Sequence, residues 1–168
     1  MRYRSPVARK RTDVEASARE RGERPQEVLD RNVDELLQET RVATAGVQFL
    51  FAFLLTLPFT QRFGDLTDFQ RDLYPLTLIS ATCAAIVFIA PVAFHRVLFR
   101  QHEKQAVVTF ADRALLVGLV LLLIGISSAV LLVLDVVLGR GWAVAGCAVV
   151  TLLAVGLWFA LPMARRAR

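Results

Sequence analysis

Four apolar runs, each of about twenty residues or more, constrain the fold of this 168-residue chain more than any other feature. They cover roughly residues 42–60, 73–94, 114–138 and 142–163. A helix rises about 1.5 Å per residue, so each run is long enough to cross a hydrocarbon core of about 30 Å. A backbone in lipid must satisfy its own hydrogen bonds, and the runs lack the alternation of a transmembrane strand. We therefore predict four membrane-spanning helices.

Composition and charge placement fit this class. Hydrophobic residues make up 55% of the chain and the mean hydropathy is +0.50, which is more apolar surface than a soluble domain of this size can bury. Charged residues fall in the N-terminal segment, the loops and the C-terminal end, with Asp135 as the exception near the end of the third span. We expect an all-α integral membrane protein, with four transmembrane helices in an up-and-down bundle of two hairpins and the first helix extended into the cytoplasm.

The polar N-terminal segment divides into two parts. Residues 1–24 are rich in Arg, Glu and Ser, so they cannot bury enough surface to offset ordering entropy, and we expect a disordered basic tail. Pro25 suits the first turn of a helix, and Glu27 follows where the helix dipole favours an acid. The expected organisation continues with a cytoplasmic amphipathic extension of the first helix over 25–41, a transmembrane domain over 42–163 and a basic C-terminal tail over 164–168.

An apolar seam runs along the expected extension. Alternating steps of four and three residues place four side chains on one helix face: Leu29, Val33, Leu36 and Thr40. An apolar stripe must be shielded from water, and the sequence is compatible with three ways of covering it. The stripe packs on the second and third helices around residues 97–98 and 107–108, lies on the membrane surface, or pairs with another subunit or protein. This seam is our candidate association surface.

Basic residues set the expected orientation, because cytoplasmic loops carry an excess of Lys and Arg. The N-terminal flank, the loop between the second and third spans and the C-terminal tail are all basic. The first loop also holds acids, and the third loop is a tight turn at 139–141. We expect a multi-pass protein of the plasma membrane with both termini in the cytoplasm. The net charge of +5 then reflects topology and contact with anionic lipid of the cytoplasmic leaflet, with no need for nucleic acid.

The first loop predicts where the second helix begins. Thr67 and Gln70 have the Thr-x-x-Gln spacing of a capping box, so we expect that helix to start near Asp68. Pro75 then kinks the helix or marks the join between a short interfacial turn and the span.

Polar side chains inside the spans are the remaining candidates for chemistry. Asp135 sits on the order of 14 Å from the membrane midplane, where Arg62, Arg140 or water can reach it. An ionisable residue in a membrane is a functional hypothesis by default, yet an ion pair joining the hairpins explains Asp135 more simply. Gln48 lies about 6 Å from the midpoint of the first span, and a hydrogen bond between helices explains it. Gln48, Asp135 and Arg62 are the candidate intramembrane polar or ion-path residues.

Motifs for catalysis, cofactors and metals are missing from the sequence. Cys83 and Cys147 fall inside spans without C-x-x-C spacing, so we interpret them as packing residues. His95 and His102 have no carboxylate or thiol placed with them, which makes a poor metal site. There is no Gly-rich phosphate loop, nucleophile elbow or paired acid. We expect no enzyme, no cofactor and no bound metal, and the sequence identifies no small-molecule substrate.

Four runs carry a resemblance to a known family: 36–42 (LLQETRV), 46–51 (GVQFLF), 54–63 (LLTLPFTQRF) and 90–96 (APVAFHR). They are similar to hallmarks of a family of small bacterial four-span membrane proteins of unknown function, some of whose members carry an automatic label of sodium:proton antiporter. The resemblance covers about residues 30–140. It directs attention to seven positions: Gln48, Pro58, Thr60, Arg62, Pro91, His95 and Arg96.

Two functions from different classes fit these features. We favour a non-enzymatic membrane protein that acts by association, as a homo-oligomer or as an accessory subunit, so its partner is itself or another membrane protein. This hypothesis rests on the seam and on small residues spaced four apart, such as Ser80 and Ala84, which favour close helix contacts. The alternative is a proton or sodium transporter or channel formed by an oligomer whose axis brings together Gln48 and Asp135 from several copies.

Overall fold

The computed structural model describes residues 18–22, 24–98 and 104–166, and these ranges contain helices and no strand. The elements are α2 (Pro25–Thr56), the short 3₁₀ helices η1 (Leu57–Phe59) and η2 (Gln61–Asp65), α3 (Asp68–Leu98), α4 (Lys104–Leu138), α5 (Arg140–Val155), the π-helix η3 (Gly156–Ala160) and α6 (Leu161–Arg166). Four helical segments are long and apolar enough to cross a membrane. The predicted all-α fold with four spanning helices is confirmed. Most of the tail predicted over 1–24 lies outside the described residues, and residues 18–21 form a helical turn.

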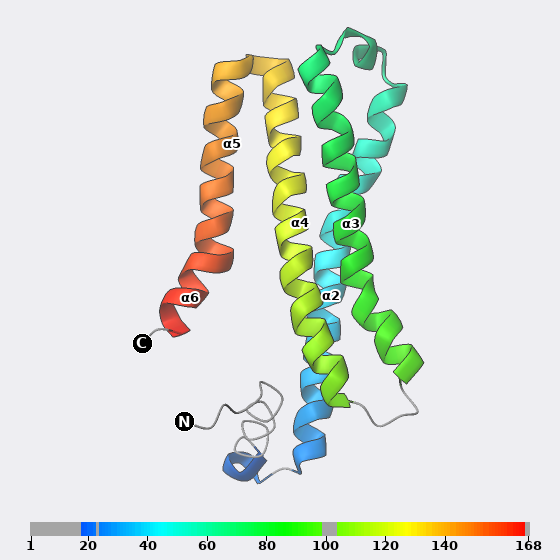
Figure 1. The fold of residues 1–168 in the computed structure, drawn as a ribbon, viewed down its shortest axis with the longest axis vertical. Helices are drawn as coiled ribbons and strands as arrows, with labels where there is room; N and C mark the ends of the chain where they lie inside the picture. The colour runs from blue at the N-terminus through cyan, green and yellow to red at the C-terminus, as the bar shows by residue number, and fades with distance from the viewer. Residues whose placement is uncertain (1–17, 23, 99–103, 167–168) are drawn as a thin grey trace, which may run out of the picture.

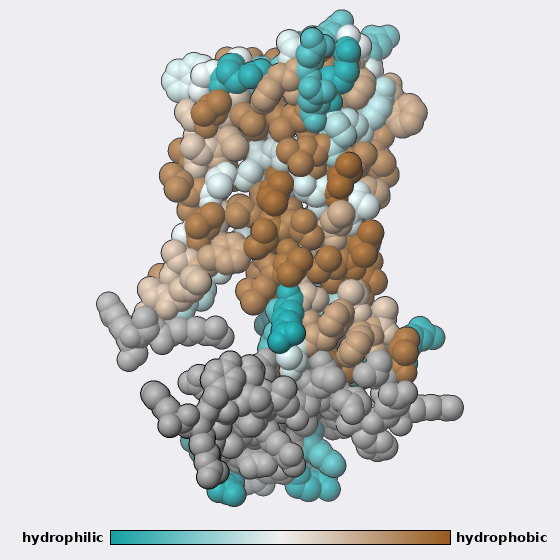
Figure 2. Space-filling view, viewed as in Figure 1, coloured by the Kyte–Doolittle hydropathy of each residue, from teal (hydrophilic) through white to brown (hydrophobic). Residues whose placement is uncertain are grey.

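The helices form two hairpins whose tips lie at the same end of the molecule (Figure 1). η1 and η2 join α2 to α3, whereas Gly139 alone joins α4 to α5. Gly139 has φ 83°, a conformation that glycine adopts without the penalty of a Cβ atom. The end of the molecule that holds the tips of both hairpins is called the hairpin end. The opposite end, where α2 begins and α6 ends, is called the terminal end. Figure 2 shows a broad band of apolar side chains between polar residues at the two ends.

Helices α2 and α3 begin where the sequence predicts. Helix α2 starts at Pro25 with Glu27 in its first turn. Helix α3 starts at Asp68, and the capping box is formed, because the Thr67 N–H donates to Gln70 Oε1 at 3.0 Å and the Gln70 N–H donates to Thr67 Oγ1 at 3.4 Å. Such residues indicate a helix start because the first N–H groups of a helix have no partner within the helix and need one from nearby side chains.

The core lies between α3 and α4, with α2 packed against both helices. Two clusters of buried side chains make up this core: Leu54, Tyr74, Ala81 and Leu132 in one, and Val47, Ala84 and Phe88 in the other. Small residues allow the helices to approach closely. A Cβ atom on Gly118 of α4 would lie 2.7 and 2.9 Å from ring atoms Cδ1 and Cζ of the fully buried Phe88, so a larger residue there would force the ring to move.

In the described part of the chain, helix α5 packs along its length against α4 and touches α3 through its first residue, Arg140, which leaves the bundle open on one side (Figure 1). Two polar contacts join the middle of α5 to α4. The Ser127 and Thr151 hydroxyls lie 2.8 Å apart, and Cys147 Sγ donates to the Ser127 carbonyl oxygen at 3.3 Å. Gly146 permits the close approach, because a Cβ atom there would overlap the side chain of Leu134. Most of α5 therefore faces lipid.

The fourth span bends where α5 gives way to η3 and α6 (Figure 1). The Leu161 N–H bonds to the carbonyl of Gly156, five residues earlier, instead of four. Pro162 has no N–H, and its ring would collide with the carbonyl of Trp158 in a regular helix. The π turn relieves this collision. The sequence prediction of a span over 142–163 does not include the bend.

We expect Gly118→Ala to lower the free energy of unfolding by about 1–3 kcal/mol, because the added methyl group overlaps the Phe88 ring. Gly125→Ala is the matched control. It lies two turns further along α4, where the atom nearest to the new Cβ would be the Ala81 backbone nitrogen at 3.5 Å, an ordinary contact. Unfolding by SDS titration in bicelles compares the variants, and equal stability would contradict the packing of α3 against α4.

Candidate functional site

A buried carboxylate joins the two hairpins at the hairpin end. The side chain of Asp135, near the end of α4, is 4% exposed. Its Oδ1 accepts a hydrogen bond from Arg140 Nε at 2.7 Å, and its Oδ2 accepts from Gln70 Nε2 at 2.8 Å and from Arg140 Nη2 at 3.2 Å. Gln70 belongs to α3 and Arg140 to α5, so Asp135 links three helices. Asp135 forms an ion pair with Arg140 rather than Arg62, but both residues belong to the second hairpin. The expected link between the hairpins is instead the hydrogen bond from Gln70.

Gln70 has two roles in this cluster. Its Oε1 accepts the Thr67 N–H of the capping box, while its Nε2 donates to Asp135. An amide side chain has an acceptor on one side and donors on the other, so capping α3 turns the donors toward α4. The Thr-x-x-Gln pattern predicts the cap. It gives no signal for the second bond, whose partner lies 65 residues along the chain.

Phe69 holds Arg140 from a second direction. Cζ of Arg140 lies 3.6 Å from the centroid of the Phe69 ring, a cation–π contact worth about 0.5–1 kcal/mol at an exposed site. The Arg140 side chain is 52% exposed, so water also solvates it. We call Phe69, Gln70, Asp135 and Arg140 the hairpin clasp. Both carboxylate oxygens in the clasp are occupied, and its chemistry is that of a fixed structural link.

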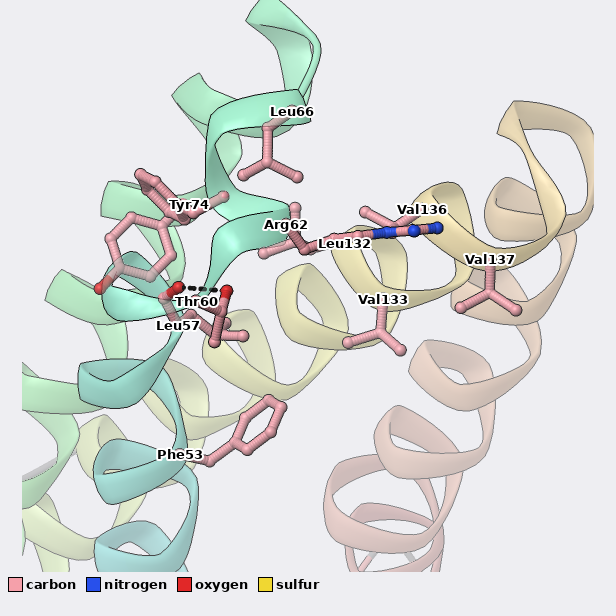
Figure 3. A pocket seen from close by; sticks show the side chains of 11 residues that line it. Phe53, Leu57, Thr60, Arg62, Leu66, Tyr74, Leu132, Val133, Val136 and Val137 are labelled. Carbon is pink, nitrogen blue, oxygen red and sulfur yellow. Dashed lines mark hydrogen bonds between the residues drawn. The ribbon is translucent and has the colours of Figure 1, made fainter.

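A groove opens next to the clasp, between the hairpin-end part of α2 and α4 (Figure 3). It has a volume of about 210 Å³, and six apolar side chains make up most of its lining: Phe53, Leu57, Leu132, Val133, Val136 and Val137. Tyr74 also lines it and donates its hydroxyl to the Leu54 carbonyl at 2.9 Å. The Thr60 hydroxyl donates to the Leu57 carbonyl at 2.7 Å. Figure 3 shows Arg62 extending from η2 toward α4 across this groove.

The three predicted ion-path residues lie in separate surroundings. Asp135 belongs to the clasp, and Arg62 lines the groove and forms no ion pair with any described residue. Gln48 is exposed on the surface of α2 and makes no hydrogen bond within the described ranges. No hydrogen bond or ion pair among these ranges connects the three residues. Within one copy of the chain they do not form a joint site.

The predicted association seam is partly covered within the chain. Val33 and Thr40 are 5% and 1% exposed, and Leu36 is half-buried. Val107 of α4 is also buried, in accord with a cover from the third spanning helix, whereas Val97 of α3 is 76% exposed and does not take part in such a cover. The side chain of Leu29 lies outside the described residues. At Val33 and Thr40 the chain itself supplies the cover, so these two residues are not a free surface.

A family model described as a family of unknown function (DUF6328) matches residues 22–162, which include both hairpins, the clasp and the groove. The chain belongs to this family. Comparison with curated proteins and with solved structures gives no match. The resemblance to a four-span family of unknown function is thus confirmed. DUF6328 is a family of unknown function and carries no described activity.

We expect Arg140→Gln to lower the free energy of unfolding by about 1–3 kcal/mol, because it leaves the buried Asp135 carboxylate without its cation. Arg71→Gln is the control at the same end of the bundle. Arg71 lies 3.9 Å from Asp68 in an exposed pair, which is worth about 0–1 kcal/mol. Denaturation of the purified variants in bicelles measures both changes, and similar losses would show that the clasp contributes no more than a surface pair.

Proposed function

We propose that this member of DUF6328 is a non-enzymatic membrane protein that works by association, either with further copies of itself or as an accessory subunit with another membrane protein. The exposed amide of Gln48 on α2 carries this proposal. The missing catalytic motifs noted in the sequence make an enzymatic role the weaker hypothesis.

The position of Gln48 makes its exposure costly in a single copy. It lies about 12 Å along the helix axis from Thr56, where α2 ends, which is within the hydrocarbon. Its neighbour Phe49 is 80% exposed, as expected for a face that meets lipid. Lipid offers no hydrogen bond to the amide, so a partner that does is favoured. A glutamine side chain that bonds across a helix interface contributes about 1 kcal/mol.

The surroundings of Gln48 suit a partner helix. Ala45 and Ala52 lie one turn before and one turn after it on the exposed face of α2, and Gly46 is exposed nearby. Small residues let two helix backbones approach closely enough for van der Waals contact and for side-chain hydrogen bonds. Because the chain itself buries Val33 and Thr40, the proposed association surface is this outer face of α2 rather than the seam.

The alternative function, movement of protons or sodium through an oligomer, rests on the same exposed amide. Copies that associate around Gln48 would place several amides along a shared axis. In liposomes, the alternative predicts an ion-driven pH change that Gln48→Leu reduces. Association without transport predicts no flux.

We also propose that the protein lies in the plasma membrane with both termini in the cytoplasm, where basic residues contact anionic lipid. Basic residues predominate in the sequence segments that flank the terminal end, whereas the loop over 61–67 holds one acid, Asp65, beside Arg62. A reporter that is active only in the cytoplasm should give signal when fused after Arg168. The same reporter inserted between Gly64 and Thr67 should be silent, and the opposite pattern would invert the orientation.

Gln48→Leu should decrease the mass of the native particle or release a co-purifying chain, because it removes the proposed hydrogen bond between subunits. Gln61→Leu is the control, since Gln61 is an exposed glutamine in the hairpin-end loop, away from the proposed surface. Mass measurement of gently extracted protein compares the two variants with the wild type. A wild-type particle that contains one chain only would contradict the proposal.

A further inference from the structure

We propose that the groove between α2 and α4 is a binding site for one anionic phospholipid of the leaflet at the hairpin end. One acyl chain lies along the apolar lining, and the phosphate group binds Arg62. This inference goes beyond association and does not depend on it. The proposed site is a single defined site at the hairpin end. It is therefore distinct from non-specific contact between anionic lipid and the basic residues at the terminal end.

The lining of the groove fits a hydrocarbon chain. Its side chains are apolar apart from those of Thr60, Arg62 and Tyr74. The hydroxyls of Thr60 and Tyr74 already donate to backbone carbonyls of η1 and α2, so neither hydroxyl is an unsatisfied hydrogen-bond donor in the groove. Val133 and Phe53 are 43% and 52% exposed on its walls, which leaves apolar surface for a chain to cover. A flexible chain can occupy this space without a polar group of its own.

The dimensions of the groove favour a single acyl chain over a protein helix as the occupant. The groove holds about 210 Å³, and a helix with its side chains is about 10–12 Å wide. The lining on α4 runs from Leu132 to Val137, which is about 8 Å of helix axis. A narrow, short groove of this kind accepts one acyl chain more readily than a row of side chains from a partner.

Arg62 supplies the charge that selects the headgroup. Among the lining residues in the described part of the chain, it alone is charged, and its guanidinium forms no ion pair there. The neighbouring acids do not neutralise it: Asp135 is bonded to Arg140 and Gln70, and Asp65 is exposed and unpaired with Arg62. Arg62 follows the end of the first span, at the depth of lipid headgroups. A guanidinium matches the geometry of phosphate oxygens, and a long cationic side chain reaches the interface from an apolar wall.

A phosphatidylglycerol probe with a photoreactive diazirine in its acyl chain tests the site. The protein is placed in phosphatidylcholine nanodiscs with a small fraction of the probe, and labelled positions are mapped by mass spectrometry. Groove positions such as Val133 should be labelled more strongly than Leu152, which is 71% exposed on the lipid-facing side of α5. Arg62→Gln should reduce labelling of the groove about fivefold and leave labelling at Leu152 unchanged.

Two variants and a second probe make the test decisive. Arg71→Gln, which removes another arginine of the same end, should leave groove labelling unchanged. Val133→Trp should fill the groove and abolish labelling of Phe53 while Arg62 remains. A phosphatidylcholine probe with the same chain should label the groove less than phosphatidylglycerol does. Equal labelling of the groove and α5, no effect of Arg62→Gln, or equal labelling by both lipids would overturn the proposal.

Discussion

The pairing of Asp135 with Gln70 and Arg140 is the contact that brings both hairpins to one point at the edge of the hydrocarbon. A carboxylate that is 4% exposed is stable there only when charge and hydrogen bonds compensate for lost water. The clasp supplies both, from α3 on one side and from the start of α5 on the other. Its position beside Gly139 fixes where α4 ends and α5 begins, and hence the height of the second hairpin relative to the first.

Away from the clasp, small residues bring α3 and α4 into close contact. Gly118 against Phe88 and Gly125 against Ala81 allow α3 and α4 to meet closely, which accounts for a core centred on this pair. In the described part of the chain, helix α5 packs against α4 and reaches α3 through Arg140 of the clasp. The outer faces of α2 and α5 are therefore left to lipid or to a partner, and the proposed functions of Gln48 and Arg62 both arise from this open arrangement.

Local signals in the sequence were sufficient for the number of spans, the fold class and the starts of α2 and α3, because each depends on residues close together in the chain. Arg140 was one of the predicted partners of Asp135, since only five residues separate them. The role of Gln70 was not predictable, because its bond to Asp135 depends on how the hairpins meet. The groove was not predictable for the same reason, because residues of both hairpins line it. The π turn was missed because the fourth span was predicted as a helix without a break at Pro162.

The most direct test of the clasp is a double-mutant cycle with Gln70→Ala, Asp135→Ala and the combined variant, each unfolded by SDS titration in bicelles. Replacing Gln70 also removes the cap of α3. This loss of stability occurs in the single and in the double variant, so it cancels when the coupling free energy is calculated. We expect a coupling free energy of about 0.6–1.7 kcal/mol between the two residues, the range for hydrogen bonds between membrane helices. A coupling of zero within error would contradict a clasp that joins the hairpins.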